Sequence, residues 1–112
     1  MIRSATISVT IVLMMNAAIA AEGPHHFSCN GNLIEPTSLA PSPISIRLTL
    51  GSAHKVSINL GKGDSSARVV SDNKIQLKFQ TKEFVGEFFH YTSDLFLIYK
   101  SGHLAKLTCM VI

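Results

Sequence analysis

The chain has 112 residues, and ten Lys or Arg residues against seven Asp or Glu residues give a net charge of +3 at neutral pH. A chain of this length supports one domain with one modest hydrophobic core, so we expect a single domain in this sequence. The basic residues are spread singly along the sequence, so they form no cluster of the kind that nucleic acid requires. We therefore predict no nucleic-acid partner.

Residues 1–20 resemble a secretory signal peptide. Arg3 supplies a positive charge, residues 5–15 are uncharged and mostly apolar, and Ala18 and Ala20 form an A-x-A cleavage pattern. The apolar run is short for a hydrocarbon core about 30 Å thick, so we expect no stable membrane insertion once the segment is removed. We predict cleavage after Ala20 or Ala21 and a periplasmic or secreted location.

The chain that remains after cleavage is mildly charged. Nine of the ten basic residues and all seven acids lie beyond Arg3, which leaves a net charge of +2. Residues 21–26 are predicted to form a flexible N-terminal lead, and residues 27–112 a single β domain. His25 and His26 lie in this lead without a third ligand nearby, which indicates a solvated tail. We expect no metal and no cofactor.

Cys29 and Cys109 are the two cysteines of the chain. In an oxidising compartment, two cysteines of a small exported protein usually pair. The sequence has neither the C-x-x-C spacing of a catalytic dithiol nor the ligand set of a zinc site. We therefore predict one structural disulfide, which closes a loop of about 80 residues.

Apolar and polar residues alternate through the middle of the chain. A period of two predicts strands with one buried face, which is typical of antiparallel sheets. The strands with this pattern are residues 44–50, 55–60 and 74–80. Turn-forming residues lie between them at 51–54, 61–64 and 71–73, and a short strand is expected at 67–70.

The two ends of the domain are also predicted to be strands. The first strand is expected at 27–34, and residues 35–43, with three prolines, are expected to form a surface loop. The last three strands are expected at 84–91, 95–100 and 104–111. Residues 95–99 have no polar face, so we expect both of their sides to be covered. Side-chain parity directs Cys29 and Cys109 towards the core. The parity of residues 84–91 is ambiguous, and we expect Glu87 to face solvent because a buried carboxylate would need a partner.

About eight strands and no helical periodicity predict an all-β domain, closed by one disulfide. The two architectures that fit are a small antiparallel barrel of about eight strands and a two-sheet sandwich. In a barrel with simple up-and-down order, the first and last strands become antiparallel neighbours. The Cys29–Cys109 bridge would then join the two strands at the seam.

The sequence contains no motif for a known catalytic centre. G-x-S-x-G, H-E-x-x-H and a phosphate-binding loop are all missing, so we predict that the protein is not an enzyme. The aromatic residues between Phe88 and Tyr99 either fill the core or form a contact surface. A barrel of this size is largely filled by its own side chains, so a cavity for an apolar ligand is not favoured.

The mature chain resembles small uncharacterised exported proteins of Gram-negative bacteria. The resemblance depends on residues 27–31 (FSCNG), 94–99 (DLFLIY) and 107–109 (LTC), and it implies no known activity.

A weaker resemblance is to the periplasmic inhibitors of C-type lysozyme, which are eight-stranded barrels with an early and a late cysteine. Their aromatic-x-Cys-x-Gly motif matches residues 27–31. Their Lys-Gly-x-x-Ala-x-Leu motif is similar to residues 102–107, with Lys100 displaced by Ser101. In that family the lysine enters the lysozyme cleft together with a serine from a second motif. That second motif has no counterpart here, so only Lys100 carries over.

The sequence thus predicts an exported binding or envelope-structural module with a protein partner in the cell envelope. One alternative is an inhibitor of a cell-wall hydrolase, and another is a carrier of a small apolar ligand. The candidate contact residues are Tyr99, Lys100, Ser101 and His103, which surround the expected turn at 101–103.

Overall fold

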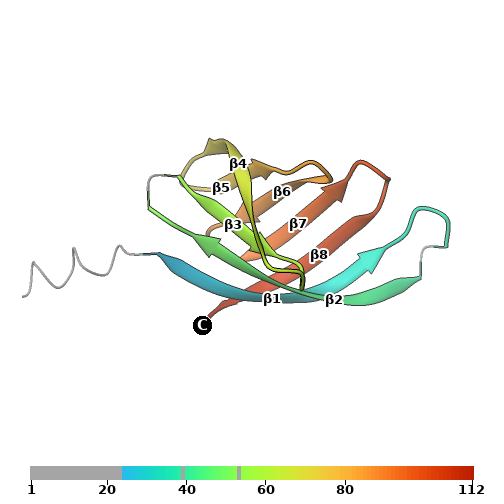
Figure 1. Cartoon of the computed structure of the whole chain (residues 1–112). Helices are drawn as coiled ribbons and strands as arrows, with labels where there is room; N and C mark the ends of the chain where they lie inside the picture. The colour runs from blue at the N-terminus through green and yellow to red at the C-terminus, as the bar shows by residue number, and fades with distance from the viewer. Residues whose placement is uncertain (1–23, 39, 53) are drawn as a thin grey trace, which may run out of the picture.

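The computed structural model describes residues 24–38, 40–52 and 54–112. The predicted signal peptide and residues 21–23 of the predicted lead lie outside the described residues. Within them, no helix has the length and apolar character needed to cross a membrane. Eight strands follow one another along the chain (Figure 1). They are β1 (His25–Ile34), β2 (Pro41–Leu50), β3 (Val56–Asn59), β4 (Asp64–Asp72), β5 (Gln76–Gln80), β6 (Phe84–Phe89), β7 (Asp94–Tyr99) and β8 (Leu104–Val111).

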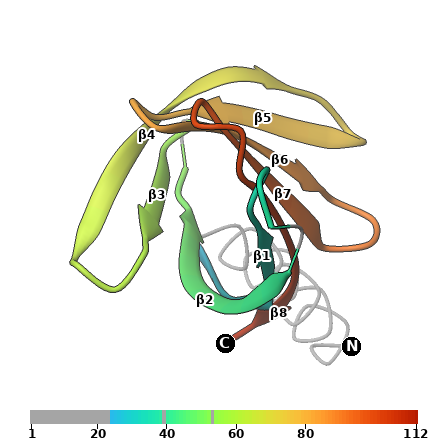
Figure 2. The ribbon, with the colours of Figure 1, turned by 90° about the vertical axis from the view of Figure 1, so that its right-hand side faces the viewer.

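The strands form a closed antiparallel barrel in sequence order. Each strand pairs with the next one, and β8 returns to pair with β1 along Phe27–Ile34. Figure 2 looks onto the end of the barrel from which the β1–β2 hairpin extends. The structure confirms the all-β class with about eight strands and the up-and-down order, and it selects the barrel over the two-sheet sandwich.

The core consists of buried side chains from every strand except β4, whose Ala67 and Val69 are partly buried against it. The largest core side chains are Phe79, Phe84 and Phe88, each no more than 2% exposed. Gly86 lies opposite Phe79 across the β5–β6 pair, and a Cβ atom at Gly86 would overlap the Phe79 ring. The absence of a side chain at this position therefore makes room for the aromatic ring. The barrel interior is occupied by its own side chains.

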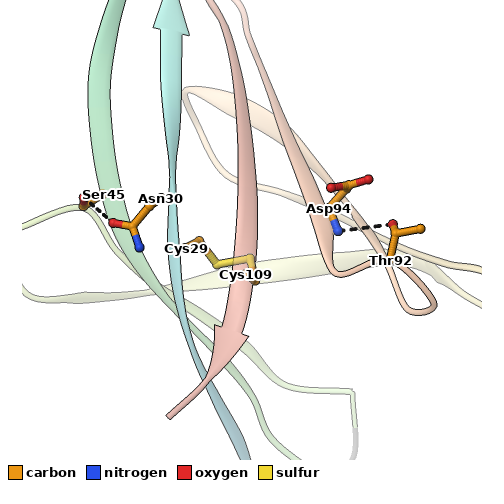
Figure 3. The surroundings of a disulfide bond; sticks show 6 residues. All are labelled: Cys29, Asn30, Ser45, Thr92, Asp94 and Cys109. Carbon is orange, nitrogen blue, oxygen red and sulfur yellow. Dashed lines mark hydrogen bonds between the residues drawn. A yellow bond between two sulfur atoms is a disulfide. The ribbon is translucent and has the colours of Figure 1, made fainter.

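The disulfide joins the seam between β1 and β8. Cys29 and Cys109 are direct partners in the β1–β8 register, and their sulfur atoms are bonded to each other (Figure 3). Both residues are buried, at 0% and 4% exposure. The N–H of Cys109 also donates a hydrogen bond to the carbonyl of Ser93, at 2.8 Å. This bond holds the β6–β7 turn against β8 beside the disulfide. The predicted pairing and the predicted inward direction of both cysteines are confirmed.

β1 begins two residues earlier than the sequence indicates. His25 pairs with Leu50 and His26 pairs with Thr49, so these histidines belong to a strand, although the sequence placed them in a flexible lead. The carbonyl of His26 accepts a hydrogen bond from the N–H of Ile112 at 3.0 Å. Backbone pairing on both sides therefore orders this segment, and such pairing has no signature in local sequence.

Residues 41–43 belong to β2, although the sequence placed them in a loop. β2 pairs with β1 along its whole length but with β3 only from Arg47 onward. Proline is compatible with a strand where its missing N–H faces an open edge, and Pro41 and Pro43 share one direction because they are two residues apart. We infer that the backbone nitrogens of Pro41 and Pro43 face the edge of β2 that has no β3 partner. Because these nitrogens carry no hydrogen, they hinder the addition of a foreign strand at that edge.

The sequence was also wrong about the sides of β7. Leu95 and Leu97 are fully buried, but Ile98 on the outer side is 45% exposed. Within the part of the chain that the structure describes, the outer face of β7 is therefore apolar and partly open to solvent. Glu87 of β6 faces outward as predicted, and its Oε2 lies 3.7 Å from Lys78 Nζ.

Candidate functional site

The candidate contact residues lie at one end of the barrel, which we call the β7–β8 end. This end carries the β1–β2 hairpin and the connections 60–63, 81–83 and 100–103, which join β3 to β4, β5 to β6 and β7 to β8. The structure brings Tyr99, Lys100, Ser101 and His103 together, because they are consecutive or nearly so around one tight turn. Figure 2 shows this turn beside the β5–β6 turn.

The β7–β8 turn is closed by its own hydrogen bonds. The N–H of Tyr99 donates to the carbonyl of His103 at 2.9 Å, and the N–H of Gly102 donates to the carbonyl of Tyr99 at 3.0 Å. Gly102 has a φ of 95°, a conformation that glycine adopts without steric cost. Ser101 Oγ and His103 Nδ1 are 2.8 Å apart, within hydrogen-bond distance. Both the backbone and the side chains of the turn are therefore held in one arrangement.

A second set of contacts holds this turn against the β5–β6 turn. The N–H of Lys100 donates to the carbonyl of Glu83 at 2.9 Å. Thr81 Oγ1 accepts from the N–H groups of Glu83 and Phe84, at 3.2 and 3.3 Å, which stabilises the neighbouring turn. Lys82 and Lys100 are both exposed, and neither takes part in an ion pair within the described residues. The two turns thus present two ammonium groups that are not in an ion pair, together with the exposed carboxylate of Glu83.

The ring of Tyr99 packs between the core and the β7–β8 turn. Its ring centroid lies 5.1 Å from that of Phe84 and 6.2 Å from that of His103. Burial raises the pKa of the Tyr99 phenol above its ordinary value of 10.0, and the negative charge of Glu83 raises it further. Tyr99 is therefore a half-buried anchor, whereas Lys100 and Ser101 are the exposed members of the set.

This raised pKa predicts how stability depends on alkaline pH. The folded state holds the phenol proton more tightly than the unfolded state, so unfolding releases a proton between pH 10.0 and the raised pKa. The contribution of Tyr99 to the free energy of unfolding is complete below pH 10.0 and is lost as the pH rises through the pKa of the folded state. Tyr99→Phe is expected to lose less stability than the wild type between about pH 8 and pH 11 in urea unfolding. Tyr91→Phe is the control, because Tyr91 is 78% exposed, and equal slopes for wild type and Tyr99→Phe would contradict the prediction.

A depression of about 300 Å³ lies next to these turns. Its polar lining comes mainly from the β5–β6 turn and β4, and its apolar lining includes Leu60, which is 40% exposed. The residues around it are Ile58, Leu60, Ser65, Ser66, Thr81, Lys82, Glu83 and Phe84. Sequence reasoning missed this depression, because its residues come from the stretches 58–60, 65–66 and 81–84, which meet only when the β3–β4 and β5–β6 hairpins pack side by side.

A different polar cluster lies at the opposite end of the barrel. Asp72 Oδ2 is 3.4 Å from His54 Nδ1, and Asp72 Oδ1 is 3.3 Å from His90 Nε2. These side chains line a depression of about 250 Å³. The sequence placed Asp72 in a turn and gave no signal that two histidines would meet it. Within the described residues, no group of three or more His, Cys, Asp or Glu side chains could hold a metal ion. The contacts of Asp72 link the end of β4 to the β2–β3 and β6–β7 connections, which carry His54 and His90.

This chain was compared with protein families, curated proteins and solved structures. No protein-family model, no curated protein and no solved structure matches this chain. The function is therefore argued from the geometry of the site.

Proposed function

We propose that this protein is an exported binding module that contacts a protein partner of the cell envelope through its β7–β8 end. The observation that supports this proposal is the rigid, exposed turn that carries Lys100 and Ser101. Hydrogen bonds hold this turn at its base and against its neighbour. A preorganised contact loses little conformational entropy when it binds, so a small surface of this kind can bind well.

The chemistry of the β7–β8 end indicates the kind of partner. Lys82 and Lys100 add positive charge, which favours a partner with an acidic surface. The neighbouring depression exposes part of Leu60 and so accepts an apolar side chain. A polar, charged rim around an apolar contact is the usual anatomy of a protein–protein interface.

The proposed compartment is the periplasm or the exterior of the cell. A disulfide persists in an oxidising environment, and the buried Cys29–Cys109 bridge is consistent with one. The signal-peptide pattern supports the same location. We propose no catalytic role, because the sequence carries none of the motifs G-x-S-x-G, H-E-x-x-H or a phosphate-binding loop.

Site-specific photocrosslinking in cells tests the proposal. A photoreactive residue at Ser101 is expected to capture one protein in defined stoichiometry, whereas the same residue at Lys55, at the opposite end of the barrel, is expected to capture none. With the purified partner, Lys100→Glu is expected to weaken binding at least about tenfold, because a repulsive charge replaces an attractive one.

Lys74→Glu is the matched control for this experiment. Lys74 is also an exposed lysine in a turn, but it lies between β4 and β5 at the opposite end. Equal affinities for Lys100→Glu and wild type would refute the proposed contact surface. Adducts that form from Lys55 and not from Ser101 would place the contact at the other end of the barrel.

A second candidate function is the inhibition of a cell-wall hydrolase. The observation that favours it is the exposure of Lys100 and Ser101 on a tight turn, a shape that can enter a substrate cleft. Titration of a C-type lysozyme with the purified protein is the direct test. Loss of lysozyme activity that Lys100→Glu abolishes would support this candidate, and full activity at micromolar excess would remove it for that enzyme.

The third alternative, carriage of a small apolar ligand, has less support. Phe79, Phe84 and Phe88 occupy the centre of the barrel. An apolar ligand would therefore bind in a surface depression or displace the core. We do not propose it.

A further inference from the structure

The outer face of β6, β7 and β8 carries an ordered pattern of apolar and charged side chains. We call it the β7 face, and it consists of Val85, Glu87, Phe96, Ile98, Leu104 and Lys106. Figure 1 shows the three strands side by side. Ile98 is 45% and Leu104 is 38% exposed, so the apolar part of the face is open to solvent.

The strand registers place these residues in two rows across the sheet. In the first row Phe96 has Glu87 as its partner on β6 and Lys106 as its partner on β8. In the second row Ile98 has Val85 on β6 and Leu104 on β8. Cross-strand partners have Cβ atoms about 5 Å apart, so each row is a continuous strip of side chains. The β7 face thus has a negative charge on one side of β7 and a positive charge on the other.

We propose that the β7 face binds a second copy of this chain around a two-fold axis parallel to β7. This rotation exchanges β6 with β8 across the interface. Glu87 then lies opposite the partner's Lys106, and Lys106 opposite the partner's Glu87. In the second row Val85 meets the partner's Leu104, while Phe96 and Ile98 each meet their own equivalents.

The charges favour a second copy over an unrelated partner. Glu87 has Lys78 at 3.7 Å, whereas Lys106 is exposed and takes part in no ion pair within the described residues. An acidic partner would attract Lys106 but also meet the Glu87 carboxylate, which Lys78 compensates only in part, and a basic partner would be repelled by Lys106. A surface with opposite charges placed symmetrically about its centre is complementary to itself.

The proposed symmetry has a consequence for the other end of the molecule. A two-fold axis parallel to the strands leaves both barrels pointing in the same direction, so both β7–β8 ends lie on one side of the dimer. Two contact surfaces on one side allow bivalent binding, which strengthens attachment to a repetitive partner. The dimer itself does not depend on the function proposed for the β7–β8 end.

Sedimentation equilibrium of the oxidised protein over a range of concentrations tests the dimer. The wild type is expected to form dimers with a micromolar dissociation constant, as small interfaces do. Lys106→Glu and Glu87→Lys are each expected to raise that constant at least about tenfold, because each brings like charges together at two symmetry-related contacts. The double variant Glu87→Lys/Lys106→Glu is expected to recover dimerisation, since the opposite charges again face each other.

Two further variants test the apolar part of the interface and provide a control outside it. Ile98→Glu is expected to abolish the dimer, because it places a carboxylate and its equivalent at the axis. Arg47→Glu, which reverses an exposed charge on β2, is expected to leave the dimer unchanged. Near-ultraviolet circular dichroism verifies the fold of each variant. A wild type that stays monomeric up to about 1 mM would overturn the proposal, as would a dimer that persists in folded Lys106→Glu and Ile98→Glu.

Discussion

Replacement of both cysteines by alanine is expected to lower the free energy of unfolding by about 4–5 kcal/mol. The Cys29–Cys109 bridge spans 80 residues of sequence, so it removes a large part of the conformational freedom of the unfolded chain. It also joins the first and last strands of a closed barrel, where no turn connects them. A loss of this size is comparable to the whole stability of a marginal small domain, which is about 5 kcal/mol.

Guanidinium unfolding of the oxidised wild type and of Cys29→Ala/Cys109→Ala measures this loss. The oxidised protein is also expected to show no reaction with a thiol reagent until it unfolds. The reduced wild type is the control, because it lacks the bridge but keeps both side chains. A loss below about 1 kcal/mol would contradict the expectation and show that the β1–β8 hydrogen bonds close the seam without help.

Gly31→Ala is expected to destabilise the protein by about 3 kcal/mol, near the upper limit for overpacking in a closely packed region. Gly31 lies in β1 at the seam, opposite Leu107 of β8. A Cβ atom at this position would overlap the Lys106 carbonyl oxygen and would lie 2.6 Å from Leu107 Cα. These are backbone atoms, so the clash is relieved only if β1 and β8 move apart, and the disulfide two residues away resists that movement.

Gly51→Ala is the matched control for this substitution. A Cβ atom at Gly51 would have its nearest neighbour, Lys55 Cβ, at 3.5 Å, which is an ordinary contact. Its effect on the free energy of unfolding is expected to stay below about 0.5 kcal/mol. Urea unfolding monitored by circular dichroism compares the two variants. Similar stabilities for Gly31→Ala and Gly51→Ala would mean that β1 and β8 separate easily at this point.

Several elements of the barrel were predictable from the chain alone. The alternation in residues 44–50 assigned each side chain to the core or to solvent, because successive residues of a strand point to opposite faces. The same parity directed Cys29 and Cys109 inward. The neighbouring position of the first and last strands was predictable only on the condition that an even number of strands close into an up-and-down barrel, which the sequence left open against a sandwich. The residues of the β7–β8 turn were predictable as a group, since they are adjacent in sequence.

Other elements were not predictable, and the reason is the same in each case. Pro41 and Pro43 indicate a loop by composition, but pairing with β1 on one side makes their segment a strand. The sequence around His25 and His26 indicates a solvated tail, but both residues pair with β2 and so belong to a strand. The apolar residues 95–99 read as doubly covered, although the outer side of Ile98 is open. In each case the local sequence pattern contains no information about which strand pairs with the segment or whether another layer covers it.

The class of fold, the buried side of the strands that alternate, and the disulfide thus follow from the chain alone, because they depend on local periodicity and on the presence of only two cysteines. Tertiary structure alone decided which distant residues meet. The β5–β6 turn beneath Lys100, the contacts of Asp72 with two histidines, and the alignment of Glu87, Phe96 and Lys106 all depend on the register between strands. That register is set when the barrel closes and its whole core packs, so no single segment encodes it.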